Sequence, residues 1–142
     1  MKKLTTLLVT AMLAMAVLVG CGENPEKDMY EADVLEFVTF VNAFQELDNS
    51  DVLAYGQATV DLAEAMNMQS EEGTVIKNDF KELGEALVQV GEGIENLDQD
   101  AVDAASAKME EVNSRIEDDA LAFGNKCDEV GVSDETLEGL YY

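Results

Sequence analysis

Apolar residues in the segment 74–97 recur at strictly alternating steps of four and three. Steps of this size bring side chains to one face of an α-helix, and the strict alternation is typical of the seam along which paired helices pack knobs into holes. A helix with one apolar face must bury it against another element, so the segment predicts a fold of several packed helices. The stripe comprises Ile76, Phe80, Leu83, Leu87, Val90, Ile94 and Leu97.

A second apolar stripe marks the segment 25–47. Asn24, Pro25 and Glu26 suit the N-cap, the first helical position and the positive end of the helix dipole, respectively. We therefore expect a helix that begins at Pro25 and ends near Leu47, before the polar turn 48–50. Its apolar face comprises Tyr30, Val34, Phe37, Val41 and Phe44.

The segment 51–68 predicts a helix for which Ser50 is the expected N-cap. Gly56 lies inside this helix and Thr59 dilutes its apolar face, so its pattern is the weakest in the chain. A polar connector over 70–74, which contains Gly73, is expected to follow it. The apolar face comprises Val52, Tyr55, Thr59, Leu62 and Met66.

The last long helix is expected over 99–130. Asp98 or Asp100 is expected to cap its start, and Gly131 suits the position just after its end. A short helix is expected from Ser133 to near Leu140, after which the final tyrosines would fold back on the bundle. The stripe of the long helix comprises Val102, Ala105, Met109, Val112, Ile116, Ala120, Phe123, Cys127 and Val130.

Four amphipathic segments joined by short connections predict an all-α fold, an antiparallel up-down four-helix bundle. The alternative is a three-helix bundle in which the segment 51–68 is frayed or bent. Few alternating β-branched runs occur and no Asn-Gly hairpin signal is present, so strands are not expected. The bundle is expected to form one domain over 25–142.

The first 21 residues have a different character from the rest of the chain. Lys2 and Lys3 precede an apolar run over 7–19, and the run closes on Leu18-Val19-Gly20-Cys21. This arrangement resembles the signal peptide and lipobox of a bacterial lipoprotein. The resemblance implies that 1–20 is a cleaved signal peptide and that 21–24 is a short tether, with acyl chains such as palmitate on Cys21.

A lipidated Cys21 would make the lipid bilayer the first partner of this protein. Two or more acyl chains hold a protein firmly on a membrane, so we expect a lipid-anchored domain that faces outward from the cell membrane. Gly22 is not the aspartate that the lipoprotein pattern links to inner-membrane retention, so in a bacterium with two membranes we expect the periplasmic side of the outer membrane. The alternative is a transmembrane anchor over 4–22, but no basic stop-transfer cluster follows that run.

Strong acidity limits the other partners. The chain has 8 basic and 31 acidic residues. Without the first 20 residues, which include Lys2 and Lys3 and no acid, the remaining 122 residues carry a net charge of −25. Nucleic acid is not expected as a partner, because its phosphates need lysine and arginine. We expect a protein or a cationic envelope component instead. A saline habitat is a further explanation of the acidity.

The residue types argue against catalysis and against a bound metal or cofactor. The chain has no histidine, which removes the usual ligands of di-iron and haem bundles and the base of Ser-His and Cys-His pairs. The segment that contains Asp98, Asp100 and Asp103 lacks the glycine and the glutamate of an EF-hand calcium loop, and Met109 occupies the position of that glutamate. Cys127 lies on an apolar stripe, which favours a buried and inert thiol.

Glycines inside the segment 74–97 have two interpretations. Gly84 and Gly91 are seven positions apart and share one edge of the seam. They allow either the close approach of a neighbouring helix or a groove, edged by Met66 and Met68, that admits an apolar ligand or a partner helix. The sequence thus predicts a non-catalytic envelope lipoprotein that acts through interactions. A small-ligand- or cation-binding bundle is the alternative.

Overall fold

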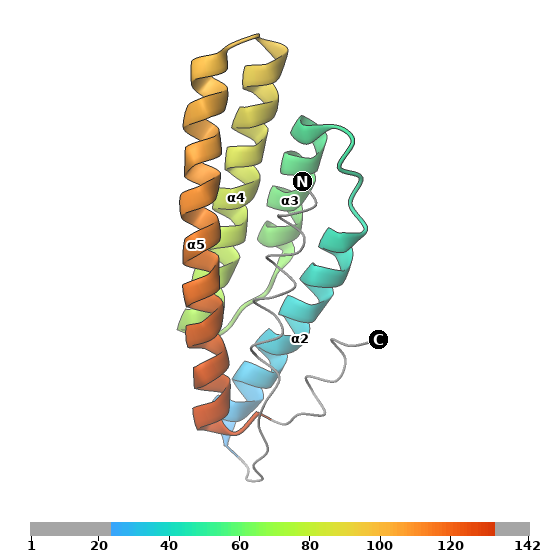
Figure 1. The fold of residues 1–142 in the computed structure, drawn as a ribbon. Coiled ribbons are helices and arrows are strands. Elements are labelled where there is room, and N and C mark those ends of the chain that lie inside the picture. Colours follow the sequence, from blue (N-terminus) through green and yellow to red (C-terminus); the bar gives the residue numbers. More distant parts are fainter. Residues whose placement is uncertain (1–23, 133–142) are drawn as a thin grey trace.

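The computed structural model describes residues 24–132, which form four α-helices and no strand: α2 (Pro25–Gln45), α3 (Val52–Ala65), α4 (Glu71–Glu95) and α5 (Gln99–Val130). Successive helices run in opposite directions (Figure 1). The predicted all-α, up-down four-helix bundle is therefore confirmed. The expected signal peptide, the tether residues 21–23 and the short helix after Ser133 lie outside the described residues. Within the described part, no helix is both long enough and apolar enough to span a bilayer.

Local capping signals set several helix ends where the sequence placed them. The Asn24 side chain accepts the Glu26 N–H (3.0 Å), and Pro25 occupies the first turn of α2. The Asp98 carboxylate accepts the Ala101 N–H (3.0 Å) at the start of α5. Gly131 ends α5 with a φ of 79°, the left-handed conformation that glycine adopts at least cost. The predicted range of α5 is matched at both ends.

Other helix ends differ from the prediction. Asp51, not Ser50, caps α3, because its carboxylate accepts the Ala54 N–H (3.1 Å). Ser70 caps α4 by accepting the Gly73 N–H (2.9 Å), so this helix begins three residues before the expected start at 74. Helix α3 ends at Ala65, because Met66 adopts an extended backbone and buries its side chain in the core.

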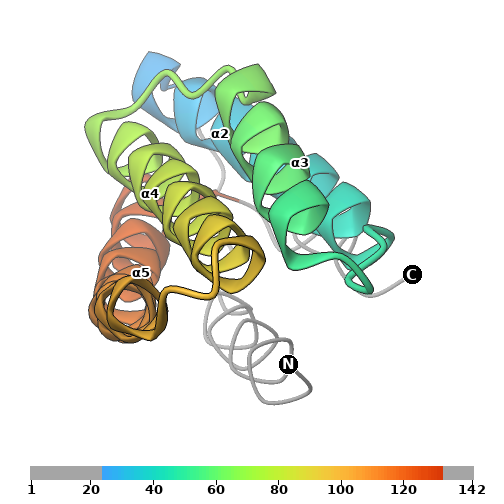
Figure 2. The same cartoon turned by 90° about the horizontal axis from the view of Figure 1, so that it is seen from above.

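The helices form two close pairs, α3 with α4 and α4 with α5, and α2 covers the remaining side (Figure 2). Large aromatic side chains bridge from α2 to α4. The Phe80 ring on α4 lies with its centroid 4.6 Å from that of Phe40, 5.9 Å from that of Phe37 and 6.5 Å from that of Phe44. Phe80 therefore stands at the centre of the core.

Burial along the α4 stripe falls from one end of the helix to the other. Ile76, Phe80 and Leu83 are fully buried, whereas Ile94 is 52% and Leu97 is 93% exposed. The α4–α5 hairpin projects past the upper ends of both α2 and α3, so neither of these two helices covers the stripe there (Figure 1). Helix α4 also ends at Glu95, two residues before the expected end at Leu97, so the last residue of the stripe lies beyond the helix.

Candidate functional site

The glycines of α4 lie where α3 approaches most closely. A Cβ built on Gly84 would lie 2.8 Å from the Val60 backbone nitrogen, and one built on Gly91 would lie 2.7 Å from Leu53 Cα. Gly56 of α3 completes the contact, since its Cβ would lie 2.6 Å from the Val88 nitrogen. Distances this short leave no room for a side chain, so close helix packing accounts for these glycines.

The four residues expected to line a groove do not come together. Gly91 lies against the first turn of α3, whereas Met66 and Met68 follow the last turn of that helix. Met66 is buried in the core, and Met68 packs partly buried against it. Met66 and Met68 therefore lie at the opposite end of α3 from Gly91 and do not edge a groove beside it.

Substituting alanine for Gly84 and Gly91 together tests this packing. Alanine favours a helix by about 1 kcal/mol per site, but overpacking against rigid backbone costs about 1–3 kcal/mol per site. We therefore expect a net loss of unfolding free energy, measured by chemical denaturation. The exposed Gln89→Ala in the same helix is the control and should change stability little. A double variant as stable as the wild type would instead favour open space beside α4.

A buried carboxylate joins α2 to the connector before α4. Asp33 is fully buried, and its two oxygens accept the N–H groups of Gln69 (2.7 Å) and Ser70 (2.8 Å) and the Ser70 hydroxyl (2.5 Å). Gly73 is required beside it, because a Cβ there would lie 2.5 Å from Asp33 Oδ2. We call Asp33, Ser70 and Gly73 the Asp33 latch. No local sequence pattern predicts this latch, because its residues are far apart in the chain.

Two more contacts hold the same connector. Lys77 donates from Nζ to the carbonyl oxygens of Glu64 (3.1 Å) and Met66 (2.5 Å), which satisfies the end of α3. The Tyr30 hydroxyl donates to the Glu72 carboxylate, and burial together with this bond raises the pKa of the Tyr30 phenol. These contacts are structural, because each one closes a helix end or joins two helices.

An ion-pair network crosses from α4 to α5. Arg115 Nε lies 2.7 Å from Asp79 Oδ1, and the same guanidinium pairs with Glu82. Asp79 is buried, and its second oxygen has no hydrogen-bond partner among the described residues. Burial raises the pKa of Asp79 to about 6, with Asp119 adding to the rise and Arg115 opposing it. Asp79 is therefore a titrating group inside the α4–α5 interface.

Asp79 should make stability depend on pH. Its folded-state pKa of about 6 lies above the ordinary 3.8, so its contribution is complete below about pH 4 and is lost as the pH rises through 6. Asp79→Asn removes this titration. The difference in unfolding free energy between the variant and the wild type should therefore shift by up to about 3 kcal/mol between pH 4 and pH 7.5, in favour of the variant at higher pH. A difference that stays constant over this range would contradict the assignment.

Cys127 is buried on the apolar face of α5, as expected, and it forms no disulfide with any described residue. Burial raises the pKa of its thiol to about 12. Because the thiolate is the reactive form, this side chain is inert at neutral pH. Within residues 24–132, no group of three or more histidine, cysteine, aspartate and glutamate side chains is arranged to hold a metal ion.

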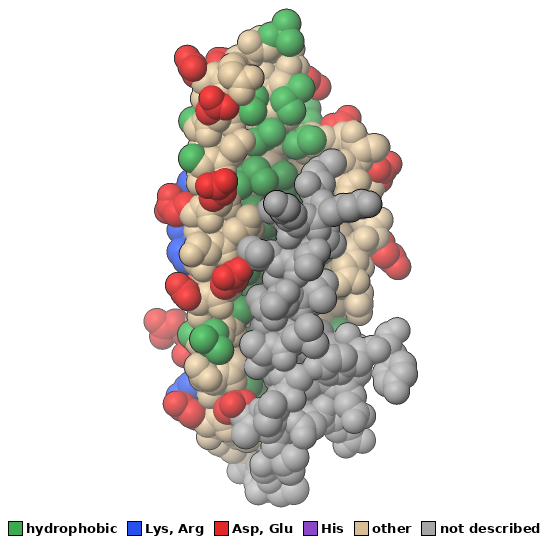
Figure 3. Space-filling view, in the orientation of Figure 1, with side chains coloured by type: hydrophobic (Ala, Val, Ile, Leu, Met, Phe, Trp, Pro, Cys, Tyr) green, Lys and Arg blue, Asp and Glu red, His purple; other side chains and the backbone are tan. Residues whose placement is uncertain are grey.

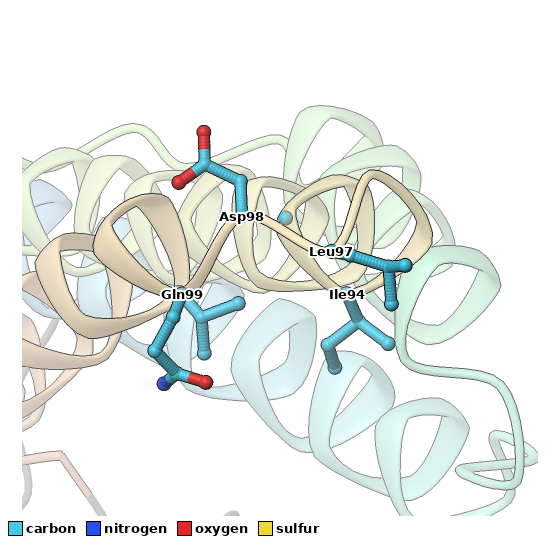
Figure 4. Close-up of a pocket in the computed structure, with 6 residues that line it drawn as sticks. Ile94, Leu97, Asp98 and Gln99 are labelled. Atoms are coloured by element: carbon cyan, nitrogen blue, oxygen red, sulfur yellow. The ribbon is translucent and has the colours of Figure 1, made fainter.

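The exposed end of the α4–α5 hairpin combines apolar side chains with acidic ones. We call residues 92–103 the α4–α5 tip. Apolar side chains gather at this end of the molecule (Figure 3). Ile94 and Gln99 extend on one side of the turn and Asp98 on the other (Figure 4). The tip contains five acidic residues and no lysine or arginine: Glu92, Glu95, Asp98, Asp100 and Asp103.

No protein-family model, curated protein or solved structure matches this chain. The function is therefore inferred from the geometry of the described residues. Among the features above, the latch, the glycine contact and the ion-pair network hold helices together. The α4–α5 tip is different, because its two exposed apolar side chains, Ile94 and Leu97, are not covered by any described helix. It is the candidate functional surface.

Proposed function

We propose that this protein is a membrane-anchored, non-catalytic envelope lipoprotein that acts by binding another envelope component through the α4–α5 tip. The exposure of Ile94 and Leu97 on an acidic surface is the observation that carries the interaction. The sequence Leu18-Val19-Gly20-Cys21 supports the anchor. An exposed apolar patch of this kind is typical of surfaces that bind a partner.

The direction of the helices supports the same proposal. Asn24, the last residue of the expected tether, caps the start of α2, and α2 starts at the end of the bundle opposite the tip (Figure 1). Helix α5 has 32 residues, which at 1.5 Å per residue gives a length of about 48 Å. A chain held at Cys21 would present the tip away from the bilayer. The negative charge of an anionic membrane surface would also repel the acidic tip.

Substituting Cys21 with serine tests the anchor. In cells fed an alkyne analogue of palmitate, we expect the wild type to become labelled and Cys21→Ser to remain unlabelled, because the sulfur that carries the lipid is gone. Cys127→Ser is the matched control and should be labelled like the wild type. Intact-mass measurement of the purified protein gives a second reading. A wild-type mass that retains the leader and carries no lipid would remove the anchor from the proposal.

A further inference from the structure

The backbone at Leu97 is unfavourable for a leucine. Its φ is 55°, the left-handed region, and among the described residues it is the only non-glycine with a positive φ. Gly131 adopts a similar conformation after α5, so the chain uses glycine elsewhere for this geometry. The Leu97 side chain is 93% exposed and gains no burial in return. Neither local backbone preference nor core packing accounts for leucine at this position.

The surface of the tip has an apolar ridge at Ile94 with a hollow on each side, and Leu97 lines one of the two hollows. One hollow of about 260 Å³ is lined by Ile94, Leu97 and Val102, with Gly93 at its floor. The other, of about 190 Å³, lies between α4 and the start of α3 and includes Val52, Leu53 and Gly91. Ile94 stands between the two hollows, because it lines both. A ridge flanked by hollows suits the apolar face of a helix.

The negative charge around the tip favours a basic partner helix. No lysine or arginine occurs in 28–76 or in 82–107, so the chain that forms this end of the bundle is acidic throughout. The basic residues of the described chain fall elsewhere and are engaged: Lys27, Lys81, Lys108, Arg115 and Lys126 with carboxylates, and Lys77 with backbone carbonyls. A second copy of this chain would bring like charges together, and an anionic bilayer would repel the tip.

We propose that the α4–α5 tip docks a basic amphipathic helix of a partner protein, whose apolar residues cover Leu97 and Ile94 while its lysines and arginines face the surrounding acids. This inference rests on the proposed function and names the chemistry of the partner. The apolar contact gives affinity, and the opposite charges give orientation and a faster encounter. Binding should weaken as salt rises, because exposed charge pairs are screened.

The test uses a peptide of about five helical turns with leucine on one face and lysine on the other. The protein made from the full-length gene is placed in uncharged phosphatidylcholine nanodiscs, or used in solution if it carries no lipid, and empty nanodiscs give the background. We expect the peptide to bind the wild type. Leu97→Gly should weaken binding by about tenfold or more, the size expected for one buried leucine. The same variant should be at least as stable as the wild type, because glycine suits the positive φ.

Matched variants and peptides separate the proposal from its competitors. Glu92→Lys with Glu95→Lys should weaken binding and reduce its salt dependence. Leu121→Ser, which changes a side chain on α5 that is as exposed as Ile94, should leave binding unchanged. A peptide with glutamate in place of lysine should not bind. Lipidation is scored separately by mass, so loss of the anchor and loss of docking are distinguishable outcomes.

Four results would overturn the docking proposal. The first is no binding of the leucine–lysine peptide to the wild type. The second is equal binding by the wild type and Leu97→Gly. The third is Leu97-dependent recruitment to phosphatidylglycerol vesicles without peptide, which would assign the tip to membranes. The fourth is Leu97-dependent self-association in sedimentation experiments, which would assign it to a second copy of the chain.

Discussion

Replacing Phe80 with alanine is expected to lower the free energy of unfolding by about 3–5 kcal/mol. The ring is fully buried and contacts the rings of Phe37, Phe40 and Phe44 across the bundle. Its removal takes away both the burial of the ring and the aromatic contacts, and it leaves a cavity that stiff helices fill only partly. Because these three rings all belong to α2, the loss falls mainly on the attachment of that helix.

Chemical denaturation followed by circular dichroism measures this change. The control is Leu121→Ala, since Leu121 is 52% exposed on α5 and its truncation should cost little. A Phe80→Ala protein that keeps wild-type stability would mean that α2 is not held through this ring. Near-ultraviolet circular dichroism of the variant gives a separate reading of how the remaining aromatic rings pack.

Asp33→Ala is expected to be comparably destabilising, by about 3–5 kcal/mol. The carboxylate accepts three hydrogen bonds in a buried site, and hydrogen bonds to charged groups contribute about 1.5–3 kcal/mol each. Without it, the N–H groups of Gln69 and Ser70 lose this acceptor, and the N-cap Ser70 loses its support. The loss is expected even though removing one acid from a strongly acidic chain relieves repulsion.

The control for Asp33 must remove the same charge. Asp61→Ala does so on the exposed side of α3, where the carboxylate bonds only weakly to Gln57 (3.3 Å). Its effect should stay within about 0.5 kcal/mol. If Asp33→Ala and Asp61→Ala had equal effects, the Asp33 latch would not stabilise the fold. Hydrogen exchange of the Gln69 and Ser70 amides should also speed up selectively in Asp33→Ala.

Several features that depend on neighbouring residues in the chain were predictable from the sequence, although the caps Asp51 and Ser70 were not. Asn24, Pro25, Asp98 and Gly131 act through bonds within one helical turn, and the structure confirms each of them. The helical period of the apolar residues likewise gives the fold class, because it states which face each helix must bury. The three-helix alternative is not observed, since α3 is formed over Val52–Ala65.

Features that depend on distant contacts were not predictable in the same way. Gly73 looked like part of a connector, but it lies in the first turn of α4, and Asp33, forty positions earlier, occupies the space that a side chain there would need. Asp33 itself is an acid beside an apolar stripe, and nothing local shows that its partners follow 36 and 37 residues later. Leu97 is exposed because the α4–α5 hairpin extends past the ends of α2 and α3. The apolar pattern of one segment does not indicate how far the neighbouring helices extend.

The aromatic attachment of α2 also divides the molecule mechanically. Helices α3, α4 and α5 meet through small residues and close backbones, whereas α2 is held at a greater distance by rings and by the Asp33 latch. We expect a pulling force on the start of α2 to be borne first by these aromatic contacts and by the Asp33 latch, because α2 approaches the other helices less closely than α4 approaches α3 and α5.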